Sequence, residues 1–318
     1  MRRVLVACLA CSACGGGGPH PGELLAPRTF VYMAADGAAI YGSSGDATVQ
    51  RIDLASRAVT TVVDLGATLP AGGVVGIALV GDSMYLGYSS NLAAYDAVLV
   101  VPKGGGTASA VALNETQPFG LLADPDRLYW QTNGRTPTKE IRTLLRSGGT
   151  PETLATSTNQ GWSVAVGDDA LYWANENGIM RAPKSDLAHP QTIYPGNATS
   201  LAVDSTTLYF LGRGGPSAMP KAGGAVRTIA GTILNARFVA DDLGLYAIAT
   251  EARFLPDGPT RVVDGEVVRL PTYFGGLFRL DGQGRADVVA DAIAHPWGVA
   301  LDSSYVYWSV DGIYRVAR

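Results

Sequence analysis

Residues 298–315 read GVALDSSYVYWSVDGIYR, and this stretch decides the fold because its pattern recurs along the whole chain. It begins with a short apolar strand that ends in Asp302, and a tight turn follows. A second strand carries Tyr307 and Trp308, and a third strand ends in Arg315. The same order of features occurs seven times. Repeats at a regular period indicate one structural unit per repeat.

A tyrosine marks the second strand of every repeat, and an aspartate precedes it by three to five residues. The tyrosines are Tyr41, Tyr85, Tyr129, Tyr172, Tyr209, Tyr246 and Tyr307. The aspartates are Asp36, Asp82, Asp124, Asp168, Asp204, Asp241 and Asp302. Four short strands in about 40 residues, separated by Gly-rich turns, are typical of one β-propeller blade. We therefore predict an all-β, seven-bladed β-propeller with four-stranded antiparallel blades and almost no helix.

The last repeat has three strands before Arg318, so its fourth strand is expected from elsewhere in the chain. The sequence ELLA at 23–26 resembles ETLA at 152–155, which is an outermost strand of the pattern. We therefore predict that residues 22–27 join the last blade as its outermost strand and close the ring. The first strand of blade one then covers residues 30–35.

The repeated aspartates and tyrosines have structural explanations. Aspartate favours turns because its side chain accepts hydrogen bonds from nearby backbone amides. A large aromatic side chain in the second strand fills the wedge between neighbouring blades and buries a large apolar area. A metal site built from the seven aspartates is the weaker interpretation, because each lies far around the ring from the others.

Three strands contain an aliphatic-Tyr-Trp triplet: Leu128-Tyr129-Trp130, Leu171-Tyr172-Trp173 and Val306-Tyr307-Trp308. This pattern resembles the Tyr-Trp-Thr-Asp and NHL-type β-propeller repeats and the TolB-like propellers, over nearly the whole chain after its N-terminal segment. The chain differs from the first of these in lacking Thr-Asp after Tyr-Trp and in having seven repeats instead of the usual six. The resemblance implies the fold and leaves the function open, because propellers include lyases, lactonases, oxidoreductases and binding proteins.

Composition places the chain among globular proteins. Of its 318 residues, 16% are charged and 47% are apolar, with a formal net charge of -4. Such a balance lacks the basic surface that phosphate backbones require, so no nucleic-acid partner is expected. All three cysteines lie in the first fourteen residues. We therefore predict one propeller domain over residues 22–318, without a disulfide or a thiolate metal site.

The N-terminal segment reads as an export signal. Two arginines precede the apolar stretch 4–13, which is too short to span a bilayer. Its end, CSAC at 11–14 followed by four glycines, resembles a bacterial lipoprotein signal. We predict a signal peptide over 1–14, a lipid on Cys14 and a Gly-rich tether over 15–21. The protein is then exported and anchored at the bacterial cell envelope by its lipid alone. A cleaved signal with free secretion is the alternative.

Propeller geometry indicates where a ligand site would lie. The loops that enter the first strands share one face with the loops that join strands two and three, and we call this the entry face. The mouth of the central channel lies on it, and concave sites of this kind bind ligands. The candidate ligand-binding residues there are Phe119, Trp162, Asn235, Arg237, His295 and Trp297. These side chains either plug the channel or contact a ligand.

The longest insertion falls on the same face, at about residues 250–276. Within it, the alternating sequence around Asp264-Gly265 predicts a β-hairpin. The insertion caps the mouth, projects towards a partner, or is a tolerated loop without a role.

The residues that metal-dependent or nucleophilic chemistry requires are scarce. The segments that directly enter the first strands contain no acid, and one histidine, His295, adjoins them. The virginiamycin-type lyases are seven-bladed propellers of similar repeat pattern that use a histidine and acidic metal ligands. We find no corresponding histidine and acidic residues at the channel mouth of this sequence. We therefore expect no catalytic residue, metal or cofactor. The predicted function is a monomeric binding or scaffolding module for an unknown protein or small-molecule ligand. The alternative is a lyase-type or lactonase-type enzyme with its site around His295.

Overall fold

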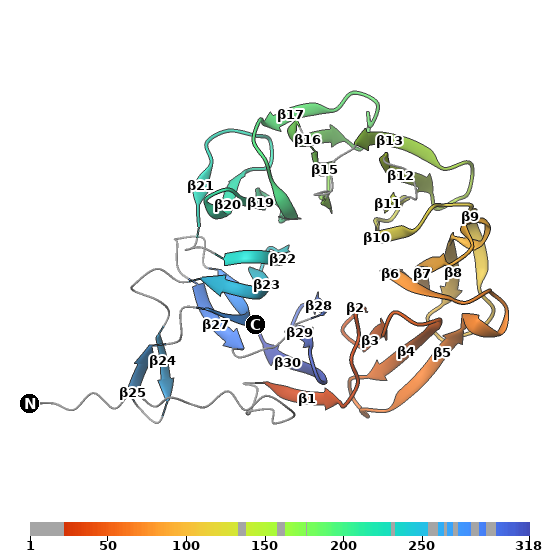
Figure 1. The fold of residues 1–318 in the computed structure, drawn as a ribbon, viewed down its shortest axis with the longest axis horizontal. Coiled ribbons are helices and arrows are strands. Elements are labelled where there is room, and N and C mark those ends of the chain that lie inside the picture. The colour runs from red at the N-terminus through yellow and green to blue at the C-terminus, as the bar shows by residue number, and fades with distance from the viewer. Residues whose placement is uncertain are drawn as a thin grey trace, which may run out of the picture.

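The chain folds as a ring of seven four-stranded antiparallel sheets, which are the blades of a β-propeller (Figure 1). The computed structural model describes residues 22–132, 138–157, 163–175, 177–229, 233–253, 260–263, 266–269, 273–280, 286–290 and 297–318. Helical structure in these residues is limited to two three-residue 3-10 turns. The predicted fold class is confirmed.

Within blades one to six the innermost strand comes first in the chain and the outermost strand comes last. Blade one contains β2 (Tyr32–Ala35), β3 (Ala39–Ser43), β4 (Thr48–Asp53) and β5 (Val59–Asp64). Blade two contains β6 (Gly72–Val80), β7 (Ser83–Ser90), β8 (Ala97–Pro102) and β9 (Ser109–Leu113). Blade three contains β10 (Pro118–Ala123), β11 (Arg127–Thr132), β12 (Lys139–Leu145) and β13 (Glu152–Ser157). Blade four contains β14 (Val164–Val166), β15 (Ala170–Asn175), β16 (Gly178–Pro183) and β17 (Gln191–Tyr194). Blade five contains β18 (Thr199–Val203), β19 (Thr207–Gly212), β20 (Gly215–Pro220) and β21 (Arg227–Thr228). Blade six contains β22 (Ile233–Asp241), β23 (Gly244–Arg253), β26 (Tyr273–Leu280) and β27 (Ala286–Ala290). The 3-10 turn η1 (Leu65–Ala67) follows β5, and η2 (Ala93–Tyr95) joins β7 to β8.

Blade seven is completed by the beginning of the chain, as predicted. It contains β28 (Val299–Leu301), β29 (Tyr305–Ser309) and β30 (Ile313–Ala317), with β1 (Glu23–Ala26) as its outermost strand. β1 runs antiparallel to β30, with Glu23 opposite Arg315 and Ala26 opposite Ile313. Strands from the two ends of the described chain therefore pair in one blade (Figure 1).

The first strand of blade one begins at Tyr32, two residues later than predicted. The amide of Phe30 donates to Ser309 Oγ of blade seven at 2.8 Å instead of joining the ladder of blade one. The Phe30 side chain is buried with Tyr307 and Ile313 of blade seven. This segment therefore seals the junction between the first and last blades.

The wedge role of the repeated tyrosines is confirmed. Tyr129, Tyr172, Tyr246 and Tyr307 are at most 1% exposed, while Tyr209 is half-buried. The second strand β3 is buried along its whole length, as expected for an inner strand covered on both faces. Large aromatic residues thus fill the space between blades.

The turn role of the aspartates is confirmed in most blades. Asp124 Oδ1, for example, accepts from the amides of Asp126 and Arg127 at 2.8 and 2.7 Å. In blade four the next residue, Asp169, forms ion pairs with Arg181 and Lys221. In blade two, the backbone carbonyl of Asp82 accepts from the amide of Lys103 at 2.9 Å.

The insertion in blade six contains the predicted hairpin. β24 (Thr260–Val263) pairs with β25 (Glu266–Arg269), and the turn residues Asp264 and Gly265 lie outside the described residues. The flanking strands β23 and β26 remain paired as far as Arg253 and Tyr273. Figure 1 shows the hairpin beside the ring and not over its axis. This position agrees with a segment that projects outward.

Candidate functional site

Two of the predicted site residues meet at the entry face. Arg237 lies in β22 and is exposed, and Trp297 lies two residues before β28. Arg237 Nη1 donates to the carbonyl oxygen of Trp297 at 3.2 Å. The Trp297 amide donates to the Ser309 carbonyl oxygen at 3.0 Å, which fixes the backbone of the segment. β22 of blade six and the segment that enters β28 of blade seven therefore place the Arg237 guanidinium against the backbone of Trp297.

The exposure of Trp297 is unusual for this chain. Its side chain is 47% exposed, whereas Trp130, Trp173 and Trp308 are at most 1% exposed. Those three occupy the wedge positions between blades, where packing explains them. Tryptophan is enriched at interfaces and among the residues that contribute most to binding energy.

The remaining candidates are placed only in part. Phe119 is half-buried in β10 of blade three, and Figure 1 shows β10 across the ring from β22 and β28. Asn235 belongs to β22 through its backbone, and its side chain lies outside the described part of the chain. Trp162 and His295 also lie outside the described residues. The predicted grouping of all six residues therefore stays a prediction.

A buried polar cluster in blade three escaped the sequence interpretation. The Glu115 carboxylate is 4% exposed and accepts from Trp130 Nε1 at 3.0 Å. It also forms a two-pronged ion pair with Arg142, through Nε at 3.2 Å and Nη2 at 3.1 Å. Glu115 lies three residues before Pro118, just upstream of the segment in which an acid was sought. An acid in an otherwise uncharged linker was the signal that could have identified it.

The linker that carries Glu115 has a constrained backbone. Asn114 and Gln117 have positive φ angles of 59° and 47°, which non-glycine residues adopt rarely. The carboxylate of Asp96, itself fully buried, accepts from the amide of Gln117 at 2.9 Å and holds this conformation. Backbone strain of this kind concentrates at functional sites. The linker delivers the chain into β10 directly before Phe119.

Gln131 is a second buried polar residue of blade three. It lies opposite Phe119 in the β10–β11 ladder, so the two side chains share one face of the sheet. Gln131 is 7% exposed, and its Oε1 has no hydrogen-bond partner in the described part of the chain. Gly120, with a φ of +61°, leaves room for the Gln131 amide, because a Cβ there would approach Nε2 to 3.1 Å.

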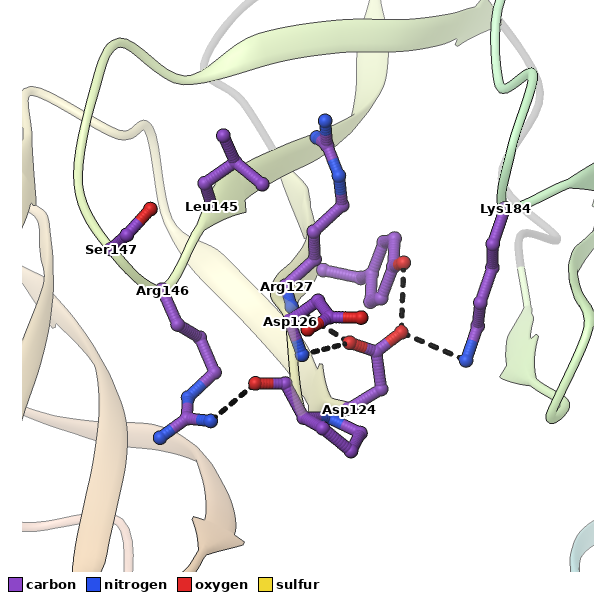
Figure 2. Close-up of a pocket in the computed structure, with 9 residues that line it drawn as sticks. Asp124, Asp126, Arg127, Leu145, Arg146, Ser147 and Lys184 are labelled. Atoms are coloured by element: carbon purple, nitrogen blue, oxygen red, sulfur yellow. Dashed lines mark hydrogen bonds and ion pairs between the residues drawn. The ribbon is translucent and has the colours of Figure 1, made fainter.

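The opposite face, which carries the turns between strands one and two, has a cavity of about 570 Å³ between blades three and four (Figure 2). Asp124 lies at its centre, where Oδ2 accepts from the Tyr129 hydroxyl at 3.0 Å and pairs with Lys184 Nζ at 2.9 Å. Burial disfavours the charged form, but the Lys184 ammonium and the turn amides hold the pKa of Asp124 below its usual value. Burial and the Asp124 charge raise the pKa of Tyr129.

This arrangement recurs around the ring. In each case a Lys or Arg after a third strand pairs with an aspartate in the first turn of the preceding blade. The pairs are Lys103 with Asp36, Lys184 with Asp124, Lys221 with Asp169 and Arg318 with Asp241. A second cavity, of about 520 Å³, contains Lys103 and Tyr41 and so has the same construction between blades one and two. The recurrence identifies these groups as inter-blade contacts and not as a catalytic site.

Groups for acid–base or metal chemistry are sparse in the described residues. Among them, no three His, Cys, Asp or Glu side chains are grouped so that they could hold a metal ion. The imidazole of His189 is exposed, and its Nδ1 lies 2.8 Å from Asp186 Oδ1. In the same part of the chain, no helix has the length and apolar character needed to cross a membrane.

Comparison with known proteins identifies the fold and no closer relationship. No protein-family model matches the chain, and no curated protein matches it. Among solved structures, PorZ of Porphyromonas gingivalis, described as an essential surface component of the type-IX secretion system, is 15% identical over 92% of this chain, with a TM-score of 0.61. The tricorn protease is 12% identical over 96% of the chain, with a TM-score of 0.62. The chain covers 37% and 34% of these two proteins.

A designed protein, Ika8, is similar over its whole length. It is 11% identical to this chain, with a TM-score of 0.59, and the alignment covers 93% of this chain and 98% of Ika8. At such low identities the likenesses show the fold alone. Together with the seven observed blades, they define the protein as a seven-bladed β-propeller.

Proposed function

We propose that the protein is a non-catalytic binding module of the bacterial cell envelope that holds its ligand at the entry face. The observation that carries this proposal is that the Arg237 guanidinium bonds to the backbone carbonyl of Trp297, a residue whose indole is half exposed. Among the described residues, no carboxylate pairs with Arg237. The pair therefore offers an exposed apolar side chain and a positive charge that contacts the backbone of the same residue.

The chemistry of this pair indicates the class of ligand. An indole face stacks on planar or apolar groups, and a guanidinium binds a carboxylate or another anion through two parallel hydrogen bonds. The half-buried side chain of Phe119 supplies a second apolar surface on blade three, across the ring from this pair (Figure 1). A ligand with an apolar or planar part and an anionic group fits this arrangement.

Replacing Trp297 with Ala is expected to weaken binding of such a ligand by about 10- to 30-fold, because a stacked aromatic anchor contributes roughly 1.4–2 kcal/mol. The probe is the best binder from a thermal-shift screen of aromatic and amphiphilic carboxylates, with its Kd measured by calorimetry. Leu243→Ala is the matched control, because Leu243 is 54% exposed in the turn between β22 and β23, on the opposite face. Equal affinity in wild type and Trp297→Ala would contradict the proposal.

The proposed localisation at the cell envelope depends on the N-terminal segment, which lies outside the described residues. Its support is the CSAC sequence at 11–14 and the glycines that follow. Stable anchoring requires two or more acyl chains, which a lipidated N-terminal cysteine supplies. A Gly-rich tether then allows the propeller to move freely relative to the membrane.

The anchor predicts that radioactive palmitate labels the protein in a bacterial host and that Cys14→Ser removes the label completely. The lipid is attached through the thiol, which serine lacks. Cys8→Ser is the matched control and should retain full labelling, since Cys8 lies within the predicted signal. Labelling that persists in Cys14→Ser would show that another residue carries the lipid, or that the modification is unrelated to this motif.

A further inference from the structure

An apolar trench runs along the outer rim between blades one and two, away from the Arg237–Trp297 pair. It encloses about 410 Å³. Val63 and Leu69 line it from blade one, and Leu99, Ala110 and Leu113 line it from blade two. Small side chains along β9 leave this space open. Its size and apolar lining are typical of a binding site.

The trench is elongated. Its lining on blade two extends from Gly106, in the turn before β9, to Leu113 at the end of that strand. A strand rises by about 3.4 Å per residue, so the five residues of β9 extend over about 17 Å. An extended peptide of five or six residues matches this length better than a compact molecule does.

Exposed apolar side chains gather at the trench. The described residues contain eight exposed large apolar side chains, and three of them belong to blade two. Tyr95 and Leu113, 44% and 62% exposed, line the trench, and Leu92, 55% exposed, lies in the same loop as Tyr95. The other five are spread over five separate places around the ring. Clustered apolar exposure marks interaction surfaces.

The strand beside the trench has an unprotected edge. β9 is the outermost strand of its sheet, so one side of its backbone has no neighbouring strand. Its sequence, SAVAL, contains no charge, whereas five of the other six outermost strands carry one: Glu23, Asp64, Glu152, Arg227 and Asp287. Natural edge strands normally use charges or prolines to prevent pairing with another chain. β9 therefore remains able to accept a further strand.

The charged residues around the trench indicate what kind of segment could bind in it. Asp64 is the single acid among the residues that line the trench, and no lysine or arginine lines it. The Asp64 side chain accepts from the amide of Gly66 at 2.9 Å, and no described lysine or arginine pairs with it. Between Arg57 and Arg127 the chain has one basic residue, Lys103, and this lysine pairs with Asp36. The trench is therefore complementary to an apolar peptide segment that carries one positively charged side chain.

We propose that the trench binds an extended segment of a partner protein, which adds to β9 as a fifth strand of blade two. Backbone hydrogen bonds to β9 supply the pairing, alternate apolar side chains of the segment enter the trench, and a lysine or arginine of the segment pairs with Asp64. The surface is separate from the entry-face pair, so the proposal stands independently of the proposed function.

The test uses the exported full chain and a phage library of random octapeptides. Enriched peptides are expected to alternate apolar residues and to contain one lysine or arginine. Ala110→Trp, which fills the trench at an exposed position, and Leu113→Ser should each weaken binding of the synthesised peptides at least tenfold. Asp64→Asn keeps the acceptor for the Gly66 amide. It should weaken peptide binding by about three- to tenfold, and only for peptides that contain the lysine or arginine.

Leu243→Ser is the matched control, because Leu243 is 54% exposed on blade six and should leave peptide affinity unchanged. Unchanged melting temperatures of the variants establish that each remains folded. The proposal is overturned if the library yields no binder, or if binders retain their affinity for Ala110→Trp and Leu113→Ser. It is also overturned if sedimentation shows a concentration-dependent dimer that Ala110→Trp dissolves, which would assign the trench to a second copy of this chain.

Discussion

Leu25→Asp is expected to open the ring and to lower the free energy of unfolding by about 3–5 kcal/mol, the range for an unpaired buried charge. Leu25 is 5% exposed and packs in one cluster with Ile40 and Ile52 of blade one and Ile313 of blade seven. A carboxylate at this position would have no partner within that cluster. Urea unfolding followed by tryptophan fluorescence measures the change.

Leu24→Asp is the matched control for ring closure. Leu24 lies in the same strand but is 47% exposed, because successive side chains of a strand point to opposite faces. Its substitution should change the free energy of unfolding by less than about 0.5 kcal/mol. If both variants unfold at the same urea concentration as the wild type, β1 does not stabilise the closed ring.

The fold was predictable because its determinants are local and repeated. The tyrosine of each second strand and the turn before it mark every blade, so seven copies specify seven blades without any knowledge of long-range contacts. The missing fourth strand of the last repeat and the ELLA sequence at 23–26 together predicted the closure that β1 makes with β30. The boundary at Phe30 was missed because its amide bonds to Ser309, a partner that is distant in sequence.

The candidate site was predictable in part, for a related reason. Repeat position alone placed Arg237 and Trp297 at the innermost strands of adjacent blades, where the structure brings them together. Glu115 and Gln131 were missed because their importance depends on burial and on partners from other strands. The trench depends on small residues of β9 facing the neighbouring blade, and such an absence of side-chain volume has no sequence motif.

The inter-blade ion pairs had a signal in the sequence, since a Pro-Lys pair ends the third strand at 102–103, 183–184 and 220–221. The sequence does not indicate which carboxylate each lysine meets, because that partner belongs to the preceding blade. In the structure the backbone amide of Lys184 bonds to the Asp169 carbonyl oxygen of its own blade, at 2.9 Å. Its ammonium reaches Asp124 in the blade before. One residue therefore fixes both the end of its strand and the position of the neighbouring blade.

Acid is consequently expected to destabilise the ring through these carboxylates. The pKa values of Asp36, Asp124, Asp169 and Asp241 are all held below their usual value by the paired cations and nearby amides, against the opposing effect of burial. An aspartate in the unfolded chain has a pKa of about 3.9. The folded state therefore binds fewer protons near that pH. The stabilisation is complete above about pH 4 and is lost as the pH falls through the folded-state pKa values.

Asp124→Ala should show this effect at a single blade junction. Asp124 is 8% exposed, and its loss leaves the Lys184 ammonium and the Tyr129 hydroxyl without their shared acceptor. The free energy of unfolding at pH 7 should fall by about 3–4 kcal/mol. The variant should also lose less stability than the wild type between pH 4 and pH 2, because it has one fewer carboxylate to protonate.

Asp126→Ala provides the control for this prediction, because Asp126 is exposed in the same turn and contributes its backbone amide, which alanine retains. Its unfolding curve should follow the wild type at every pH. Urea midpoints at pH 7, 4, 3 and 2.5 distinguish the two variants. A parallel pH dependence for wild type and Asp124→Ala would mean that Asp124 is not held ionised by Lys184. The blades would then be aligned by their apolar wedges alone, since Tyr129 would keep its burial whether or not its hydroxyl had a charged partner.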